Sequence, residues 1–232
     1  MTGAEPSLEH RSERLCVTIP IEATLAEWGR VNALVGELLE WLERRDEALA
    51  GAPFYRYRVL GDETIPFELE VGVPTEGRLD GDDRVQTGTI PAGTYTTLVH
   101  EGHPDELPDR HAALEEWAEK NGHDVARRTD GETTLWEGRY EHFQTDPTTE
   151  PDRSKWTTEI RYRLRDGFPE ELTAPTCRAL AGAGYSRLEQ LDGADAAEIE
   201  QLHGIGSSVI ETLREALSAA GYSLADEGGR SP

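Results

Sequence analysis

The residues best suited to chemistry lie in the run Thr133-Thr-Leu-Trp-Glu-Gly-Arg-Tyr-Glu-His-Phe-Gln-Thr145. Glu141 stands there among aromatic residues, with Trp136 and Tyr140 before it and Phe143 after it. A carboxylate surrounded by aromatic rings attracts an organic cation, because Coulomb and cation–π attraction act together. This run is therefore the first candidate for a ligand site.

The alternation in this run is typical of a β-strand, in which Glu141 shares one face with Arg139 and Phe143. Two other interpretations of Glu141 stay open. It is an exposed strand residue, or it is neutralised by Arg139, Arg161 or Arg163. The sequence alone does not choose between these and a ligand role.

Histidines offer a second kind of chemistry. His100-x-x-His103, together with His111, has the residue type of a metal site, but no cysteine or second paired motif accompanies it. We therefore expect loop and surface histidines, no metal and no cofactor. The sequence contains no glycine-rich phosphate loop, nucleophile elbow or serine-triad motif.

The charge of the chain limits its partners. Among 232 residues, 46 acids and 23 bases give a net charge of -23, a field that repels polyanions and attracts cations. The N-terminus has no signal-peptide pattern and no apolar run is long enough to span a bilayer, so we expect a cytoplasmic protein with no membrane contact. Cys16 and Cys177 lie far apart, and no disulfide is expected.

The elements that position Glu141 follow from periodicity. In the first unit, at about 12–75, a strand at Leu15 to Ile21 precedes a helix at Ala23 to Leu49, which has apolar residues at 3.6-residue spacing. Two alternating strands follow, Phe54 to Leu60 and Phe67 to Val73. This order is β-α-β-β.

The same order recurs at 83–165. Strand-like segments at 84–90 and 93–100 precede a helix at Leu107 to Asn121, which Gly122 should cap in the left-handed conformation. The strands Thr133 to Gln144 and Trp156 to Leu164 complete the unit. We infer an internal duplication in an α+β fold, with one antiparallel sheet and a ligand cleft between the two units.

Several aromatic residues are candidates for the walls of this cleft, although most aromatic residues belong to cores. Tyr57 and Phe67 are favoured because they come from the two β-strands that should face Glu141 across the pseudo-twofold axis. The further candidates are Tyr95, Trp136, Phe143 and the acid Glu159, for which the alternative is a solvent-facing partner of Arg161.

A family resemblance supports this arrangement. Its motifs are Gly88-Thr-Ile-Pro-Ala-Gly-Thr-Tyr95, His100-Glu-Gly-His-Pro-Asp-Glu-Leu107, Leu114-Glu-Glu-Trp117, Asn121-Gly122, Tyr140-Glu-His-Phe-Gln-Thr-Asp-Pro147 and Thr157-Thr-Glu-Ile160. In order and spacing they resemble the GyrI-like small-molecule-binding family, which is also the effector-binding domain of multidrug-sensing bacterial regulators. The resemblance is strongest at 83–164 and weaker at 15–74.

The resemblance implies a cleft that binds cationic or planar amphipathic molecules through a buried glutamate among aromatic rings. By motif this residue is Glu141. The family commonly has a tyrosine where this chain has Phe143, so one hydroxyl donor is expected to be missing. Some proteins of the family resemble hydrolases that open electrophilic cyclopropane rings, and Glu141 is the residue that would activate water in such an enzyme. Binding and hydrolysis need nearly the same residues, so both stay open.

The composition changes after residue 166, and a small all-α unit is expected at 167–225, followed by a disordered tail at 226–232. His203-Gly204-Ile205-Gly206 between two predicted helices resembles a helix-hairpin-helix, as at the end of RNA polymerase alpha subunits. From 168 to 232 four bases and eleven acids give a net charge of 4 − 11 = -7, which disfavours DNA and favours a protein partner or a structural role. Only residues 1–14 precede the first predicted strand, so no DNA-reading helix-turn-helix is expected ahead of it.

Overall fold

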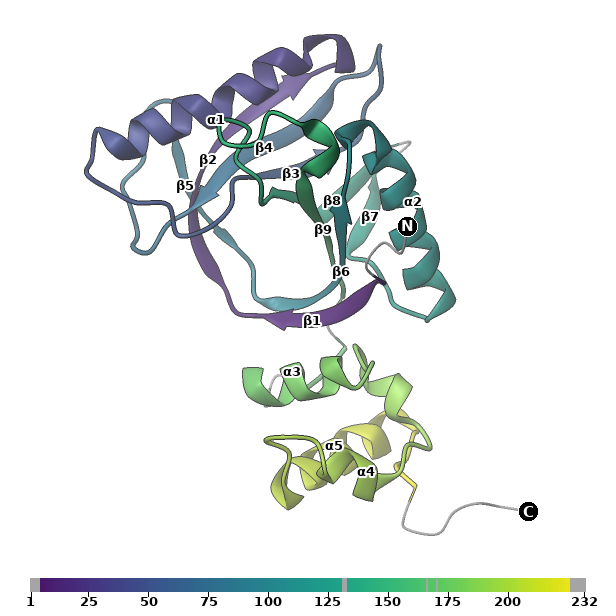
Figure 1. Cartoon of the computed structure of the whole chain (residues 1–232). Helices are drawn as coiled ribbons and strands as arrows, with labels where there is room; N and C mark the ends of the chain where they lie inside the picture. Colours follow the sequence, from purple (N-terminus) through teal and green to yellow (C-terminus); the bar gives the residue numbers. More distant parts are fainter. Residues whose placement is uncertain (1–4, 131–132, 166, 170, 226–232) are drawn as a thin grey trace.

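A nine-stranded antiparallel sheet forms the larger part of this computed structural model, which describes residues 5–130, 133–165, 167–169 and 171–225. The strands are β1 (Ser7–Arg11), β2 (Arg14–Ala23), β3 (Phe54–Val59), β4 (Phe67–Pro74), β5 (Gln86–Ile90), β6 (Gly93–Glu101), β7 (Arg127–Asp130), β8 (Thr133–Phe143) and β9 (Thr157–Arg163). Their order is β1-β6-β9-β8-β3-β4-β2-β5, with β7 paired to β8. The sheet curls into a ring (Figure 1). The predicted α+β class with an antiparallel sheet is confirmed.

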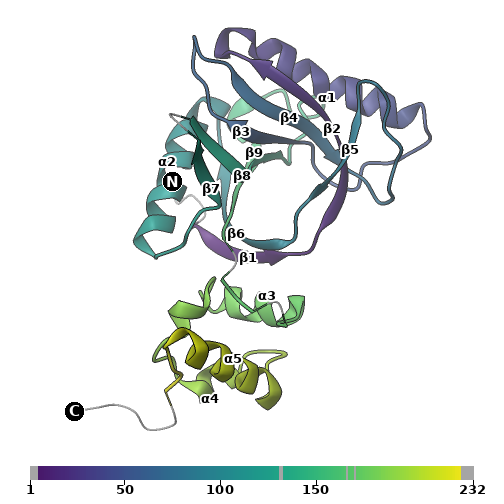
Figure 2. The same ribbon diagram turned by 180° about the vertical axis from the view of Figure 1, so that it is seen from behind.

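Two long helices, α1 (Trp28–Glu43) and α2 (Leu107–Lys120), cover the outside of this curl (Figure 2). The apolar stripe of α1 packs on side chains from β2, β3 and β4, including Tyr55 and Tyr57. Leu107 and Leu114 of α2 pack with Ile160 and Tyr162 of β9. Both helices therefore lie on the same face of the sheet, and the other face lines the inside of the ring.

The predicted helix at 23–49 is too long at both ends. Ala23 still belongs to β2, where it pairs with Phe67. Thr24 is the N-cap residue of a short 3-10 turn (Leu25–Glu27). After Glu43 the chain leaves the helix and Asp46 adopts a left-handed φ of 57°. The helix at 107–121 was predicted almost to the residue, and Gly122 has the expected left-handed φ of 71°.

The sequence pattern did not predict two of the strands, β1 and β7. Ser7-Leu-Glu-His-Arg11 has one strongly apolar residue, and β7 has none. Both are strands because a neighbour offers free backbone groups: β1 pairs with β6, and β7 pairs with the first half of β8. Hydrophobic alternation does not report strands that carry few apolar residues.

Cross-strand register sets the rows of side chains around Glu141. Tyr55, Glu141 and Ile160 are direct neighbours on β3, β8 and β9. Tyr57, Arg139 and Tyr162 form the next row on the same face. These two rows lie on the face that α1 and α2 cover.

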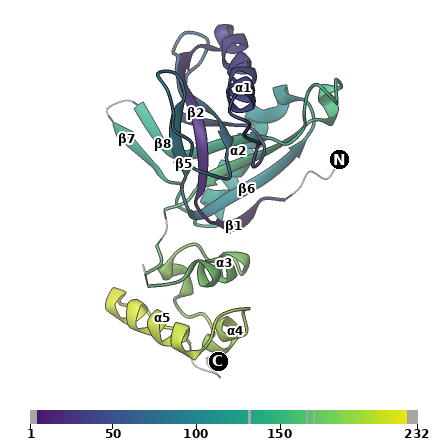
Figure 3. The ribbon, with the colours of Figure 1, turned by 90° about the vertical axis from the view of Figure 1, so that its left-hand side faces the viewer.

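The last described residues form three helices, α3 (Ala174–Gly182), α4 (Ala196–Glu200) and α5 (Ser207–Ala220), with a 3-10 turn at Leu188–Leu191. They enclose an apolar core that includes Leu180, Leu191, Ile199, Ile205, Leu213 and Leu217. α3 lies against β1 (Figure 3). The expected tail at 226–232 lies outside the described residues. No helix in the described ranges is long and apolar enough to cross a membrane.

Candidate functional site

Glu141 lies on the helix-covered face of β8, and only 8% of its surface is exposed. Tyr57 of β3 donates its hydroxyl hydrogen to Oε2 over 3.0 Å. His111 of α2 contacts Oε1 through Nε2 over 2.7 Å. Each carboxylate oxygen therefore has a hydrogen-bond partner from a different element of the fold.

The contact continues beyond His111. Its Nδ1 lies 2.6 Å from the hydroxyl of Tyr162, which lies 3.4 Å from Oε1 of Glu115. Arg139 donates to the same Glu115 oxygen over 2.9 Å, so its charge is directed to Glu115. A hydrogen-bonded series thus runs from the buried Glu141 to Glu115, whose side chain is 36% exposed.

Burial sets the protonation of these groups. It lowers the pKa of His111 below its ordinary value, and the hydrogen bond that His111 donates to Glu141 opposes this only in part. Burial and the neighbouring Glu141 raise the pKa of Tyr57 well above its ordinary value. Both partners of Glu141 are therefore uncharged at neutral pH. Among the ion pairs of the described residues, none joins Glu141 to an arginine or lysine.

An aromatic cluster lies beside Glu141. Phe143 is on the same face of β8, and its ring contacts that of Tyr55 with centroids 4.6 Å apart. Trp28, the first residue of α1, stacks on Tyr57 at 6.4 Å with an interplanar angle of 11°, and meets Phe67 edge-on at 5.2 Å. Trp28, Phe67 and Phe143 are only partly buried. They form the outer part of this cluster.

Of the predicted wall residues, Tyr57, Phe67 and Phe143 thus lie together with Glu141. Trp136 belongs to a different group of side chains. Its ring is 5.5 Å from that of Tyr162 and 4.8 Å from the Arg139 guanidinium. Phe143 has no hydroxyl, as its sequence position implied, but Tyr57 of β3 supplies a hydroxyl donor to Glu141.

Two predicted site residues lie on the opposite face of the sheet. Glu159 is paired with His142, not with Glu141, and it bonds to Arg11, Arg161 and Gln144. Tyr95 packs inside the ring with Cys16, Phe54, Ile90 and Tyr140. A β-strand alternates its side chains between two faces, so neither residue reaches Glu141. Grouping them with Glu141 was wrong for this structural reason.

His111 is the residue that the sequence interpretation missed. It was expected on the surface, but it is 6% exposed. A signal was present, because His111 stands on the buried stripe of its helix with Leu107, Leu114 and Ala118. A titratable side chain on an apolar stripe needs a buried partner.

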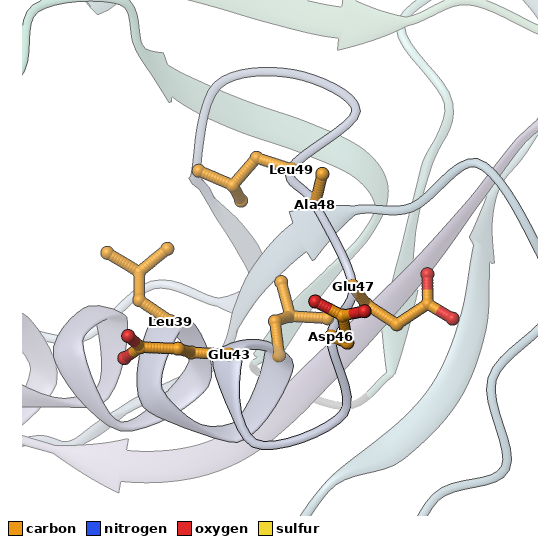
Figure 4. A pocket seen from close by; sticks show the side chains of 7 residues that line it. Leu39, Glu43, Asp46, Glu47, Ala48 and Leu49 are labelled. Carbon is orange, nitrogen blue, oxygen red and sulfur yellow. The ribbon is translucent and has the colours of Figure 1, made fainter.

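Two hollows of the described surface lie beside α1. One, of about 360 Å³, lies at the end of α1 between apolar and acidic side chains (Figure 4); it is lined by Leu39, Leu42, Glu43, Asp46, Glu47, Ala48 and Leu49. The other lies between β2 and α1, and includes Ile21, Arg30 and Arg84. Neither hollow is lined by Glu141 or by the aromatic residues beside it, so the ligand cleft that we expected at Glu141 is not one of these two.

The three histidines of the metal hypothesis have different partners for their rings. His100 lies 3.2 Å from the His103 carbonyl oxygen, and His111 contacts Glu141 and Tyr162. Within the part of the chain that the structure describes, no cluster of three or more histidine, cysteine or acidic side chains is arranged to hold a metal ion.

Several solved structures share the fold at low sequence identity. The crystal structure of the EcmrR C-terminal domain matches with a TM-score of 0.55 and 18% identity, over 69% of this chain and 97% of that one. EcmrR in its DNA complex matches with a TM-score of 0.58 and 18% identity over 69% of this chain, which spans only 57% of that chain. An uncharacterised conserved protein from Listeria innocua matches with a TM-score of 0.51 and 12% identity, over 69% of this chain and 92% of that one.

No curated protein matches the sequence. The model of one protein family, described as the GyrI-like small molecule binding domain, matches residues 5–165. This range includes the whole curled sheet, α1, α2 and Glu141. The chain therefore belongs to the family of GyrI-like small molecule binding domains, and it binds a small molecule.

Proposed function

We propose that the ligand is a lipophilic, planar or amphipathic organic cation, and that it binds beside Glu141 on the helix-covered face. One observation supports this most directly. Glu141 is a buried carboxylate whose two partners, Tyr57 and His111, donate hydrogen bonds but carry no charge at neutral pH. Its negative charge is thus hydrogen-bonded without being neutralised.

Such a site favours one class of cation. The cost of burying Glu141 is met in part by its hydrogen bonds, while the uncompensated charge stabilises any cation that reaches it. Because both oxygens already accept hydrogen bonds, the ligand needs no N–H donor. Aromatic faces from Trp28, Tyr55 and Phe143 add cation–π and apolar contact.

Binding requires movement of the aromatic cluster. Trp28, Phe67 and Phe143 are partly buried and fill the space between α1 and the sheet. We propose that these rings turn aside as the ligand enters and then stack on it. Ligand-dependent quenching of tryptophan fluorescence should accompany binding if Trp28 takes part.

Isothermal titration with tetraphenylphosphonium, an aromatic cation without N–H groups, tests the proposal. Glu141→Gln should weaken binding about tenfold or more, because the amide keeps the size of the side chain but removes its charge. Glu159→Gln is the matched control: Glu159 is 7% exposed, on the neighbouring strand, but on the opposite face. Equal affinities in wild type and Glu141→Gln, both shown to be folded, would contradict the proposal.

Hydrolysis of an electrophilic, cyclopropane-type compound is the second candidate. The observation in its favour is the Glu141–His111 pair, since a carboxylate beside an imidazole can orient and deprotonate a water. We prefer binding to hydrolysis, because binding does not also require a positioned water and a reactive substrate. Mass spectrometry after incubation with such a compound separates the two, because catalysis converts many equivalents and binding leaves the compound intact.

We also propose that residues 12–75 and 83–165 are two copies of one unit. The strand order supports this: β6-β9-β8 on one side of the centre corresponds to β2-β4-β3 on the other. Glu141 and Tyr57 then come from equivalent strands of the two copies, and the site lies at the axis between them.

Residues 167–225 are proposed to form a helix-hairpin-helix domain that contacts a protein, with 1–166 as the ligand-binding domain in the cytoplasm. Gly204 has a left-handed φ of 85°, Gly206 precedes α5, and Ile205 between them is buried. The acidic charge of this segment argues against DNA as its partner.

We further propose that the site at Glu141 recognises several different drugs. An aromatic cluster that rearranges around its ligand is compatible with such recognition.

A further inference from the structure

His111 connects the buried carboxylate to solvent. Its Nε2 lies 2.7 Å from Glu141 and its Nδ1 lies 2.6 Å from the Tyr162 hydroxyl. That hydroxyl lies 3.4 Å from Oε1 of Glu115, whose side chain is 36% exposed. Neither Tyr57 nor the aromatic cluster takes part in this series.

Charged and titratable groups face His111 from several elements. Glu141 and Arg139 come from β8, Glu115 comes from α2 itself, and Tyr162 comes from β9. Arg139 is hydrogen-bonded to Glu115, so Glu141 is the carboxylate that a protonated His111 would neutralise. The imidazole and a cationic ligand are thus two alternative counter-charges for one carboxylate.

We propose that His111 is a specificity-determining residue that makes a proton and the cationic ligand compete for Glu141. The inference rests on the proposed function. When His111 is protonated, Nε2–H donates to Glu141 and Nδ1–H donates to Tyr162, whose own hydrogen is directed to Glu115. Arrival of a cation beside Glu141 removes the attraction that holds the extra proton.

The released proton has a defined route. The Nδ1 proton passes to the Tyr162 oxygen while the hydroxyl proton of Tyr162 passes to Glu115, which gives it to water. Tyr162 is neutral before and after, and the imidazole keeps its Nε2–H bond to Glu141. One proton leaves the protein for each cation that binds to the protonated form.

The site therefore binds cations more tightly as the pH rises. Burial lowers the pKa of His111, so the change falls below the ordinary histidine range. While the imidazole is protonated, affinity should increase up to about tenfold per pH unit, and it should become constant once His111 is neutral.

Calorimetry tests this with tetraphenylphosphonium, whose own charge does not change with pH. Titrations between about pH 5 and pH 8 are run in pairs of buffers with different ionisation enthalpies, which gives the number of protons released. Wild type should release up to one proton per ligand at the acidic end and none at the alkaline end. His111→Gln keeps a side-chain N–H donor but does not titrate, and its affinity should not vary with pH in this way.

His123→Gln is the matched control, because His123 is also buried but bonds to Ser186 instead of Glu141; it should keep the wild-type proton release. Binding without proton release in wild type overturns the inference alone, whether or not the His111 variant folds. Equal pH dependence in wild type and His111→Gln does the same. Failure of wild type to bind at any pH overturns the proposed function and the inference with it.

Discussion

His111 and Glu141 form a hydrogen bond of 2.7 Å between Nε2 and Oε1, although one residue lies on α2 and the other on β8. Packing of α2 on the sheet makes this contact. His111 and Tyr57 together then provide one hydrogen-bond donor for each carboxylate oxygen of the buried Glu141. Stability and the proposed ligand binding thus depend on the same few side chains.

Removing the Tyr57 hydroxyl should destabilise the fold. Tyr57→Phe leaves Oε2 of the buried Glu141 without its partner, and an unsatisfied buried acceptor costs about 1–3 kcal/mol. The free energy of unfolding in urea measures the effect. Tyr55→Phe is the control, because its hydroxyl bonds to the exposed Asn32, and its loss should be below about 1 kcal/mol. Equal losses would contradict the hydrogen-bond partners described for Glu141.

Acid should destabilise the fold before the carboxylates titrate. Burial lowers the pKa of His111, His123 and His142, the last of these well below its ordinary value, with Arg161 adding to the effect. Below about pH 6.5 the unfolded chain then binds more protons than the folded one, so stability falls as the pH decreases.

Urea unfolding at about pH 7.5 and pH 5 measures this loss, a window above the ordinary carboxylate range. His142→Gln keeps an acceptor for Arg161 but does not titrate, so its stability should fall less between the two pH values. A loss as large as in wild type would show that His142 is not kept neutral by the fold.

Gly72 is expected to tolerate no side chain. A Cβ at this position would lie 2.3 Å from Cζ of Phe54, within the buried inside of the ring. Gly72→Ala should cost about 1–3 kcal/mol through overpacking. Gly36→Ala is the matched control, since nothing lies within 4 Å of its Cβ on the exposed side of α1, and it should stabilise by about 0.5–1 kcal/mol. Thermal unfolding of both variants checks the opposite signs.

The full chain should not bind duplex DNA at physiological salt. Its net charge of -23 gives little opportunity to neutralise phosphates. Fluorescence anisotropy of a labelled duplex at about 150 mM salt should show no saturable change. Saturable binding that weakens steeply with added salt would instead support a nucleic-acid role for the helices after residue 167.

The sequence by itself determined the class of the fold and the position of most elements. Period-two runs predicted β3, β4, β8 and β9, and the helical stripe with Gly122 predicted α2. The same alternation put Glu141 and Phe143 on one face, and the family motifs identified Glu141 among the acids of the chain. These are local properties, set by neighbours in the sequence.

Only the tertiary structure decided which residues meet at that face. Alternation says that Glu159 and Ile160 point in opposite directions, but register with β8 is needed to put Ile160 beside Glu141. The donors His111 and Tyr57 lie 30 and 84 residues from Glu141, so helix packing and the β3–β8 pairing bring them there. Contacts at such separations depend on how the whole chain packs, and no local pattern contains them.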